Sequence, residues 1–500
     1  MKKLKNTILV IFGITGDLSK RKLLPALYNL ERAGLLPEGF RIVGVSRKGT
    51  EPRDIIRMLK QSEAGKEADC PDICEKLEKI LSIVDMKLDE GDTYAGLSRE
   101  LSRIEAEAGR PLNRLFYLAI PASLFPKVTE RLAEADLNMH ENGICESRYL
   151  IEKPFGADLA SAKKLISDLN ERFGEERIFR IDHYLAKETV QNILSFRFSN
   201  PLFNGAWNNR HISHIMVTAS ESIGIEGRTA FYEGMGAMRD LVQSHLLQLL
   251  ALATMEKPKT MEAAEIHREK EKILAAIRPP EPERMKEETV RAQYRTYREE
   301  TGIADSLTET YAAVRLSIDA PEWKGVPMFI RTGKALKEKV TEITVVFTEG
   351  GAESLTSARA DAAGAEIKRN YLTLRIQPNE GIAVDLDIKK PGLDEATQAV
   401  QLDFCYRDAP GFEQIDAYAR VLYDGMRGDR TLFATGDEVL ACWRITEPVL
   451  RAWDSPDFPL HFYDNGSAGP EAADELIQKT GIAWFTDSHQ VCTPPKPSFR

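Results

Sequence analysis

A continuous apolar run that leads straight into a glycine turn sets the strongest limit on how this chain can fold. Residues 8–12 are all apolar, as in a strand that is buried on both faces of a sheet. The turn Gly13-Ile14-Thr15-Gly16 follows, and Leu23, Leu27 and Leu30 then recur at helical spacing. A strand, a tight turn and a helix in this order predict the first unit of a parallel α/β sheet.

Strand-like and helix-like segments continue to alternate through the first third of the chain. The further strand candidates are 41–45, 115–120, 149–151 and 179–181. Amphipathic helical patterns such as 159–169 lie between them. We therefore expect a doubly wound, Rossmann-like α/β domain over residues 1–185.

The remainder of the chain, residues 186–500, has a different period. Apolar and polar residues alternate in 215–218, 312–318, 344–347, 371–376 and 382–386. This alternation is typical of strands with one exposed face, so we expect a larger α+β domain with a mostly antiparallel sheet. The highly charged stretch 256–300 is expected to form surface helices and a turn, and the alanine-rich stretch 354–365 a loop.

Composition limits the partners and the compartment. Lys and Arg number 67 against 77 Asp and Glu, and this net charge of −10 does not suit nucleic acid or an anionic membrane as a partner. The first apolar run is too short to span a membrane and leads into a turn, not a cleavage site. Six scattered cysteines without a CxxC pair favour reduced thiols. We expect a cytoplasmic protein.

The glycine turn and the end of the second strand predict a dinucleotide site. Gly13-x-x-Gly16-x-x-Ser19 would let backbone N–H groups approach a pyrophosphate at a helix N-terminus, although an ordinary strand-to-helix turn is the alternative. The second strand runs into Ser46-Arg47-Lys48 without a carboxylate for a ribose 2′-hydroxyl. Arg47 can pair with a 2′-phosphate, or it is a solvated loop arginine. We expect NADP, with NAD possible as a secondary cofactor.

A cluster of polar residues follows the strand at 179–181. Asp182-His183-Tyr184 comes directly after it, and Lys187 is expected on the helix that begins there. An imidazole, a hydroxyl and an ammonium group at a strand's carboxyl end suit a phosphate. Lys153 follows the preceding strand and could join the same crevice, and Pro154 favours a cis bond more than other residues do.

His245 is the strongest candidate for a catalytic base. It lies in a largely apolar helix, 238–255, and oxidation of an alcohol by hydride loss needs a base for the hydroxyl proton. Asp182 could fix its tautomer if the fold brings the two together; otherwise His245 is a satisfied core histidine. His211 and His214, if both on one strand, would point to opposite faces, so we expect no metal.

Several ordered motifs resemble the glucose-6-phosphate dehydrogenase family along nearly the whole chain. They are FGITGDLSKRK from Phe12, EKPFG from Glu152, RIDHYLAKE from Arg180, NPLF from Asn200, RAQY from Arg291, IRTGK from Ile330 and GSAGP from Gly466. The resemblance implies an NADP-dependent oxidation of glucose 6-phosphate to 6-phospho-glucono-1,5-lactone in the oxidative pentose phosphate route. It also implies a homodimer or homotetramer formed through the sheet of the second domain.

The resemblance also implies roles for individual residues. By it, His245 would be the general base and Asp182 the carboxylate that orients it. The substrate would be held by His183, Tyr184, Lys187, Lys153, Glu221, Asp240, Lys334 and Lys339. NADP would be held by Gly13, Thr15, Gly16, Asp17, Lys22, Arg47 and Lys153. The alternatives are a dehydrogenase for another sugar phosphate or for free glucose, and a catalytically silent NADP-binding sensor.

Overall fold

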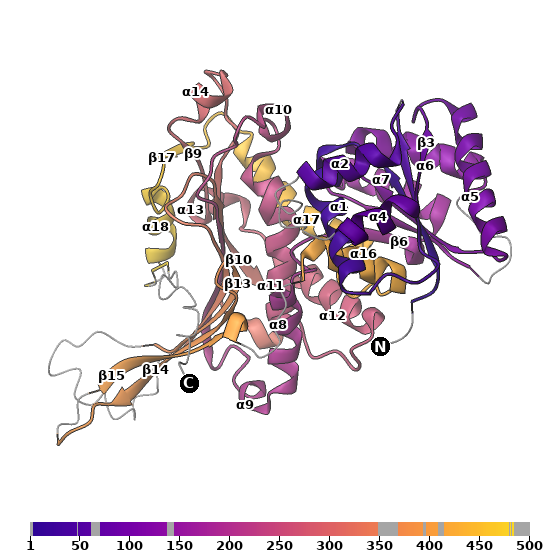
Figure 1. Cartoon of the computed structure of the whole chain (residues 1–500). Coiled ribbons are helices and arrows are strands. Elements are labelled where there is room, and N and C mark those ends of the chain that lie inside the picture. Colours follow the sequence, from indigo (N-terminus) through magenta and orange to yellow (C-terminus); the bar gives the residue numbers. More distant parts are fainter. Residues whose placement is uncertain are drawn as a thin grey trace. The chain divides into compact units, whose positions relative to one another are not determined.

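The computed structural model describes residues 4–47, 49–61, 71–137, 145–348, 369–393, 397–408, 415–479, 481 and 483–484. The chain forms two compact units (Figure 1). Unit 1 comprises 1–187, 260–267 and 415–440, and unit 2 comprises 188–259, 268–414 and 441–500. The sequence predicted one boundary at 185 and assigned the two returning segments to the second domain. Local pattern does not indicate to which sheet a later segment returns.

Unit 1 contains the expected doubly wound sheet. Its strands are β1 (Thr7–Phe12), β2 (Arg41–Ser46), β3 (Leu81–Asp85), β4 (Asn113–Leu118), β5 (Ser147–Ile151), β6 (Ile178–Ile181) and β16 (Phe433–Ala434). They lie in the order β16-β6-β5-β4-β1-β2-β3. β1 to β6 run parallel, and β16 pairs antiparallel with β6. The Rossmann-like prediction is confirmed, with an added edge strand from late in the chain.

Helices cover both faces of this sheet, and β1 shows why. Leu9 and Ile11 pack into one buried cluster, and Ile8, Val10 and Phe12 into the other, because successive strand residues point to opposite faces. The first cluster contains side chains of α1 (Leu24–Arg32), α2 (Pro52–Gln61), α4 (Pro71–Lys79) and α16 (Ala417–Arg427). The second contains side chains of α5 (Tyr94–Ala108), α6 (Phe125–Glu134) and α7 (Leu159–Phe173). A strand buried on both faces has to be apolar throughout, as this one is.

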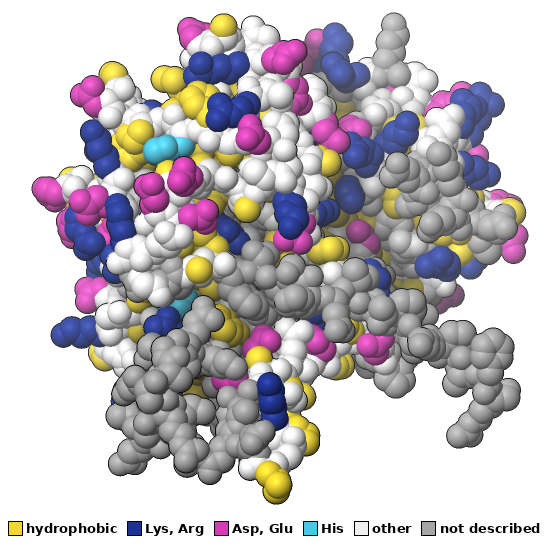
Figure 2. Space-filling model, turned by 90° about the vertical axis from the view of Figure 1, so that its left-hand side faces the viewer, with side chains coloured by type: hydrophobic (Ala, Val, Ile, Leu, Met, Phe, Trp, Pro, Cys, Tyr) yellow, Lys and Arg dark blue, Asp and Glu magenta, His cyan; other side chains and the backbone are white. Residues whose placement is uncertain are grey.

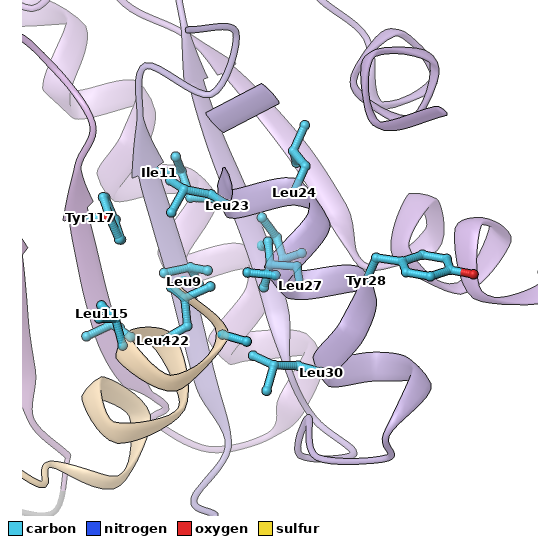
Figure 3. Packing of buried hydrophobic residues seen from close by; sticks show 14 of the residues in the cluster. Leu9, Ile11, Leu23, Leu24, Leu27, Tyr28, Leu30, Leu115, Tyr117 and Leu422 are labelled. Atoms are coloured by element: carbon cyan, nitrogen blue, oxygen red, sulfur yellow. The ribbon is translucent and has the colours of Figure 1, made fainter. Parts of the chain in front are cut away.

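Figure 3 shows the first of these clusters from close by. Leu9 and Ile11 of β1 lie beside Leu115 and Tyr117 of β4. The leucines of α1 and Leu422 of α16 pack in the same cluster. α16 is therefore part of the core of unit 1, although it lies more than two hundred residues beyond β6 in the chain.

Unit 2 contains the larger sheet, which is mostly antiparallel as predicted. Its strands are β7 (Ile212–Ser220), β9 (Thr289–Tyr294), β10 (Tyr311–Ile318), β11 (Met328–Gly333), β12 (Val340–Phe347), β13 (Tyr371–Gln377), β14 (Gly381–Lys389), β15 (Thr397–Cys405) and β17 (His461–Tyr463). Their order is β15-β14-β13-β12-β7-β11-β10-β9-β17, with β8 (Ile277–Arg278) paired to β10. Only the β7–β11 and β9–β17 pairs among these strands are parallel.

The long helices of unit 2 pack against this sheet. α8 (Glu188–Ser199), the π-helical segment η5 (Met238–Leu246) and α11 (Leu247–Thr254) contact β7 and β10 to β13 (Figure 1). Shorter helices are α9 (Pro201–Asn204), α10 (Thr229–Tyr232), α13 (Met285–Glu288), α14 (Tyr297–Thr301) and α18 (Glu471–Gln478). The segments of α12 (Ala263–Ala276) and α17 (Gly436–Trp453) each begin in unit 1 and end in unit 2.

Three expectations need comment. Part of the charged stretch 256–300 is the fully buried strand β9 and not a surface helix. The expected loop at 354–365 lies outside the described residues. Cys74, Cys145 and Cys442 are free, as expected, whereas Cys405 is disulfide-bonded.

In the part of the chain that is described, no helix combines the length and the apolarity that a membrane crossing needs. Figure 2 shows basic and acidic side chains intermixed over the face that it views.

Candidate functional site

The glycine turn lies between β1 and the first helix, and its shape requires glycine. Gly13 has φ +83°, and a Cβ added there would lie 2.5 Å from the carbonyl oxygen of Ala119. Ser19 Oγ donates to the carbonyl of Gly13 over 3.0 Å and so ties the start of the helix to the turn. The π-helical segment η1 (Ser19–Leu23) then continues into α1. The turn thus connects β1 directly to a helix N-terminus, and phosphates bind well at such a position.

The candidate cofactor residues of this edge are open to solvent. Thr15, Asp17, Lys22 and Arg47 are all exposed. β1 and β2 are neighbouring parallel strands, so the turn and Arg47 occupy the same edge of the sheet. Asp17 forms only a loose, exposed ion pair with Arg21 at 3.6 Å. Accessible cations beside a helix N-terminus fit a dinucleotide with a 2′-phosphate.

The candidate phosphate clamp lies in the turn after β6. Asp182 is buried, and its Oδ1 accepts the backbone N–H of Tyr184 at 2.9 Å. The ring centroids of His183 and Tyr184 are 5.0 Å apart, and Lys187 Nζ lies 5.6 Å from the Tyr184 ring centroid. The structure therefore gathers these residues, as predicted for a phosphate site.

One detail of that prediction is wrong. Lys187 does not lie on the following helix, because α8 begins at Glu188. Its backbone N–H donates to the carbonyl of Tyr184 over 3.1 Å and closes a turn before the helix starts. This turn holds the ammonium beside the tyrosine ring.

Lys153 and its neighbour Glu152 follow β5, which is the strand next to β6. Desolvation raises the pKa of Glu152 to about 7, while a hydrogen bond from Tyr117 Oη at 2.5 Å and the charge of Lys153 lower it. The charge of Asp182 raises it further, so these groups interact at one edge of the sheet. The Lys153–Pro154 bond is cis.

Tyr418 is a residue of this edge that the sequence analysis missed. Its ring is stacked with that of His183 at 6.4 Å between centroids, and Lys22 Nζ lies 5.9 Å from its centroid. Asp416 accepts the Tyr418 N–H at 2.8 Å and caps α16 there. The capping pattern marks a helix start, but no local signal shows that this helix returns to unit 1.

Unit 2 carries the candidate base. His245 is fully buried on η5, and Asp240 lies on the same segment. A π-helix bonds residue i to residue i+5, so it brings positions 240 and 245 nearer to one face than an α-helix would. Such π-helical turns inside helices are frequent at functional sites. The sequence predicted a helix here but not its π character.

A buried ammonium joins Asp240 to a second carboxylate of unit 2. Glu221 follows β7 and Lys334 follows β11, and these two strands are parallel neighbours. Lys334 Nζ forms an ion pair with Glu221 and lies 3.7 Å from Asp240 Oδ2. It also lies 5.2 Å from the ring centroid of Tyr232, an aromatic contact that the sequence did not indicate.

Lys339 precedes β12 and lies beside this cluster, because the first residue of β12 pairs with Ser220, the neighbour of Glu221. Its side chain is exposed and forms no ion pair with the described residues. His211 precedes β7, so it does not share a strand with His214. His214 is buried, and desolvation lowers its pKa to about 3, so the imidazole is neutral.

Comparisons with known proteins match nearly the whole chain to one family. Residues 10–192 match the family model "Glucose-6-phosphate dehydrogenase, NAD binding domain", and residues 194–485 match the corresponding "C-terminal domain". The glucose-6-phosphate 1-dehydrogenase of Chlamydia muridarum is 40% identical over 496 residues, covering 95% of this chain and 96% of that relative. The Gluconobacter oxydans enzyme of the same name is also 40% identical, with 96% and 97% covered.

Solved structures are similar as well. A glucose-6-phosphate dehydrogenase in complex with its substrate glucose-6-phosphate matches with a TM-score of 0.88 and 33% identity, over 97% of this chain and 100% of that one. A glucose-6-phosphate 1-dehydrogenase from Mycobacterium avium matches with a TM-score of 0.81 and 36% identity, over 96% and 99%.

Proposed function

Because the chain belongs to the glucose-6-phosphate dehydrogenase family, we propose that it oxidises D-glucose 6-phosphate to 6-phospho-D-glucono-1,5-lactone with reduction of NADP. This is the first step of the oxidative pentose phosphate pathway. The observation that carries the proposal is the match of both family domains along almost the whole chain. The gathered imidazole, hydroxyl and ammonium groups after β6 support it, because a sugar phosphate needs such donors.

His245 is the general base in this proposal. Its imidazole takes the proton from the C1 hydroxyl of the sugar, and Asp182 orients the ring. NADP, when bound, accepts the hydride that leaves C1. His245→Asn and Asp182→Asn should each lower kcat, and the double variant should lose little more than His245→Asn, because groups that act as one unit are not additive. If the fold losses in kcat of the two single variants multiply in the double variant, the two residues act independently.

The substrate's charged and polar ends have different partners. His183, Tyr184 and Lys187 hold the 6-phosphate, and Lys153 bridges substrate and cofactor. Glu221, Asp240, Lys334 and Lys339 bind the sugar. Holding the far end of the sugar fixes C1, so binding energy is converted into positioning.

The glycine edge of unit 1 holds the cofactor. Gly13, Thr15, Gly16, Asp17 and Lys22 surround the pyrophosphate and adjacent groups. Arg47 pairs with the 2′-phosphate and gives the preference for NADP, with NAD as a secondary cofactor. The exposure of Arg47 at the end of β2 supports this assignment.

An absorbance assay at 340 nm tests the function. Purified protein with glucose 6-phosphate and NADP should form NADPH, and kcat/KM for free glucose should be far lower because the clamp is then unused. A higher kcat/KM with free glucose or another sugar phosphate would reassign the substrate. If neither NADP nor NAD is reduced with any of these substrates, the protein is a catalytically silent NADP-binding sensor.

Assembly and location complete the proposal. A homodimer or homotetramer, expected from the family resemblance, is tested by light scattering after size-exclusion chromatography. Cell fractionation tests the proposed cytoplasmic location.

A further inference from the structure

Glu309 is a buried carboxylate that none of the roles above uses. It lies just before β10, and burial raises its pKa to about 7, while the hydrogen bond from Met238 and the charges of Arg239 and Arg291 lower it. A carboxylate that is buried at this cost, with no ion pair to any described residue, usually serves a specific contact.

That contact is with the start of η5. Glu309 Oε1 accepts the backbone N–H of Met238 at 3.0 Å, and the Glu309 carbonyl accepts the N–H of Ala237 at 2.9 Å. Met238 is the first residue of η5. A helix leaves its first N–H groups without intrahelical partners, and its N-terminus favours negative charge. Glu309 therefore caps the helix that carries Asp240 and His245.

The segment that carries Glu309 also contacts the strand end that carries Lys334. The carbonyl of Thr310, the next residue, accepts the backbone N–H of Lys334 at 3.0 Å. Glu309 and Thr310 thus fix both the helix with Asp240 and the strand end with Lys334. These are the two groups that lie 3.7 Å apart in the cluster.

The backbone opposite Glu309 is shaped for its carboxylate. Gly236 has φ +68°, and a Cβ added there would lie 2.2 Å from Glu309 Oε1. Gly234, two residues earlier, has a similar φ of +81°, but a Cβ there would meet nothing within 4 Å. The close approach at Gly236 is therefore specific to the carboxylate and not to the left-handed backbone alone.

We propose that Glu309 is a positioning residue of the reaction, which by capping η5 sets the placement of Asp240 and His245 against Lys334. The inference rests on the proposed function. It assigns no contact of Glu309 with substrate or cofactor, so its effect should appear in the kinetics for glucose 6-phosphate and not in the binding of NADP.

The two glycines provide a matched test. Gly236→Ala should lower kcat/KM for glucose 6-phosphate about tenfold relative to Gly234→Ala, because both carry the strain of a left-handed backbone but only the former displaces the carboxylate. In a Glu309→Ser background the two alanine variants should be equal, since the space at position 236 is then free. The dissociation constant for NADP should stay within about twofold in all variants.

Glu309→Gln is the conservative variant. It keeps an acceptor for the Met238 N–H and should retain more activity than Glu309→Ser. Equal kinetics of the two alanine variants in the wild-type background, or a Glu309→Ser variant within about twofold of wild type, would overturn the inference. If the wild-type protein shows no turnover, the proposed function fails. The same comparison is then made on the dissociation constant for glucose 6-phosphate.

Discussion

The two units present their candidate binding groups in opposite ways. In unit 1, Lys22 on η1 and Arg47 after β2 are exposed, so phosphates can reach them. In unit 2, Lys334 is 3% exposed and already paired with Glu221 and Asp240. Exposed cations gain most of their interaction energy on binding, whereas a buried, paired network is fixed beforehand and orients what it touches. Substitutions of these exposed cations in unit 1 should therefore change affinity, and those in the buried network of unit 2 should change turnover or stability.

The largest expected effect concerns His245, the buried base proposed in unit 2. His245→Asn should lower kcat by ~10²–10⁴ with a modest change in KM, because a general base acts only in the chemical step. His214→Asn is the matched control, since it removes another buried imidazole of unit 2 and should leave kcat unchanged. Near-normal turnover of His245→Asn would remove His245 from the role of base.

Lys334 tests the cost of breaking the buried network. Lys334→Met leaves Glu221 and Asp240 without their shared cation, so the free energy of unfolding should fall by about 3 kcal/mol. Chemical denaturation measures this, and Lys337→Met, an exposed lysine three residues later, should change it by less than about 0.5 kcal/mol. Equal stabilities of the two variants would contradict the distinction between the units.

Glu152 of unit 1 is a half-buried carboxylate whose pKa is raised by desolvation. Its folded pKa of about 7 lies above the unfolded value, so the folded state binds more protons between pH 4.5 and 7 and loses stability as pH rises through this range. Glu152→Gln removes that titration, and the difference in unfolding free energy between pH 5 and pH 8 should shrink by about 3 kcal/mol. An unchanged difference would contradict the raised pKa.

The half-buried lysine of the clamp should give a smaller effect. Lys187→Ala should raise KM for glucose 6-phosphate about 10- to 100-fold with little change in melting temperature, since a charged hydrogen bond to phosphate is lost. Lys164→Ala removes an exposed lysine from α7 of the same unit and should leave KM unchanged. An unchanged KM in Lys187→Ala would argue against the clamp.

The period of apolar residues predicted the sheets because it reflects which faces of a strand are buried. This information lies in the local sequence. β1 is apolar throughout because both faces are covered. β9 was missed because Arg291 and Gln293 suggest exposure. Both are nevertheless buried, since Arg291 donates to the carbonyls of Phe458 and Pro459 and Gln293 to those of Ser306 and Thr308.

Some candidate site residues could likewise be predicted from local sequence, and others could not. Residues next to strand ends, such as His183 and Lys187, could be proposed from the sequence because parallel strands carry ligands at their carboxyl ends. Tyr418 and Glu309 could not, because each acts on a segment far away in the chain. β16 has only two residues, which is too short for any periodic signal.

The smallest expected effect concerns the choice of cofactor at the exposed edge. Arg47→Ala should raise KM for NADP about tenfold and leave KM for NAD nearly unchanged, because only the 2′-phosphate loses a partner. Arg53→Ala is the control: this arginine is equally exposed, lies six residues later on α2 and pairs with Glu51 at 2.7 Å. If KM for both cofactors rises equally in Arg47→Ala, Arg47 contacts a group that the two share. The exposed edge would then provide affinity without discrimination, and the preference for NADP would have to come from other residues of unit 1.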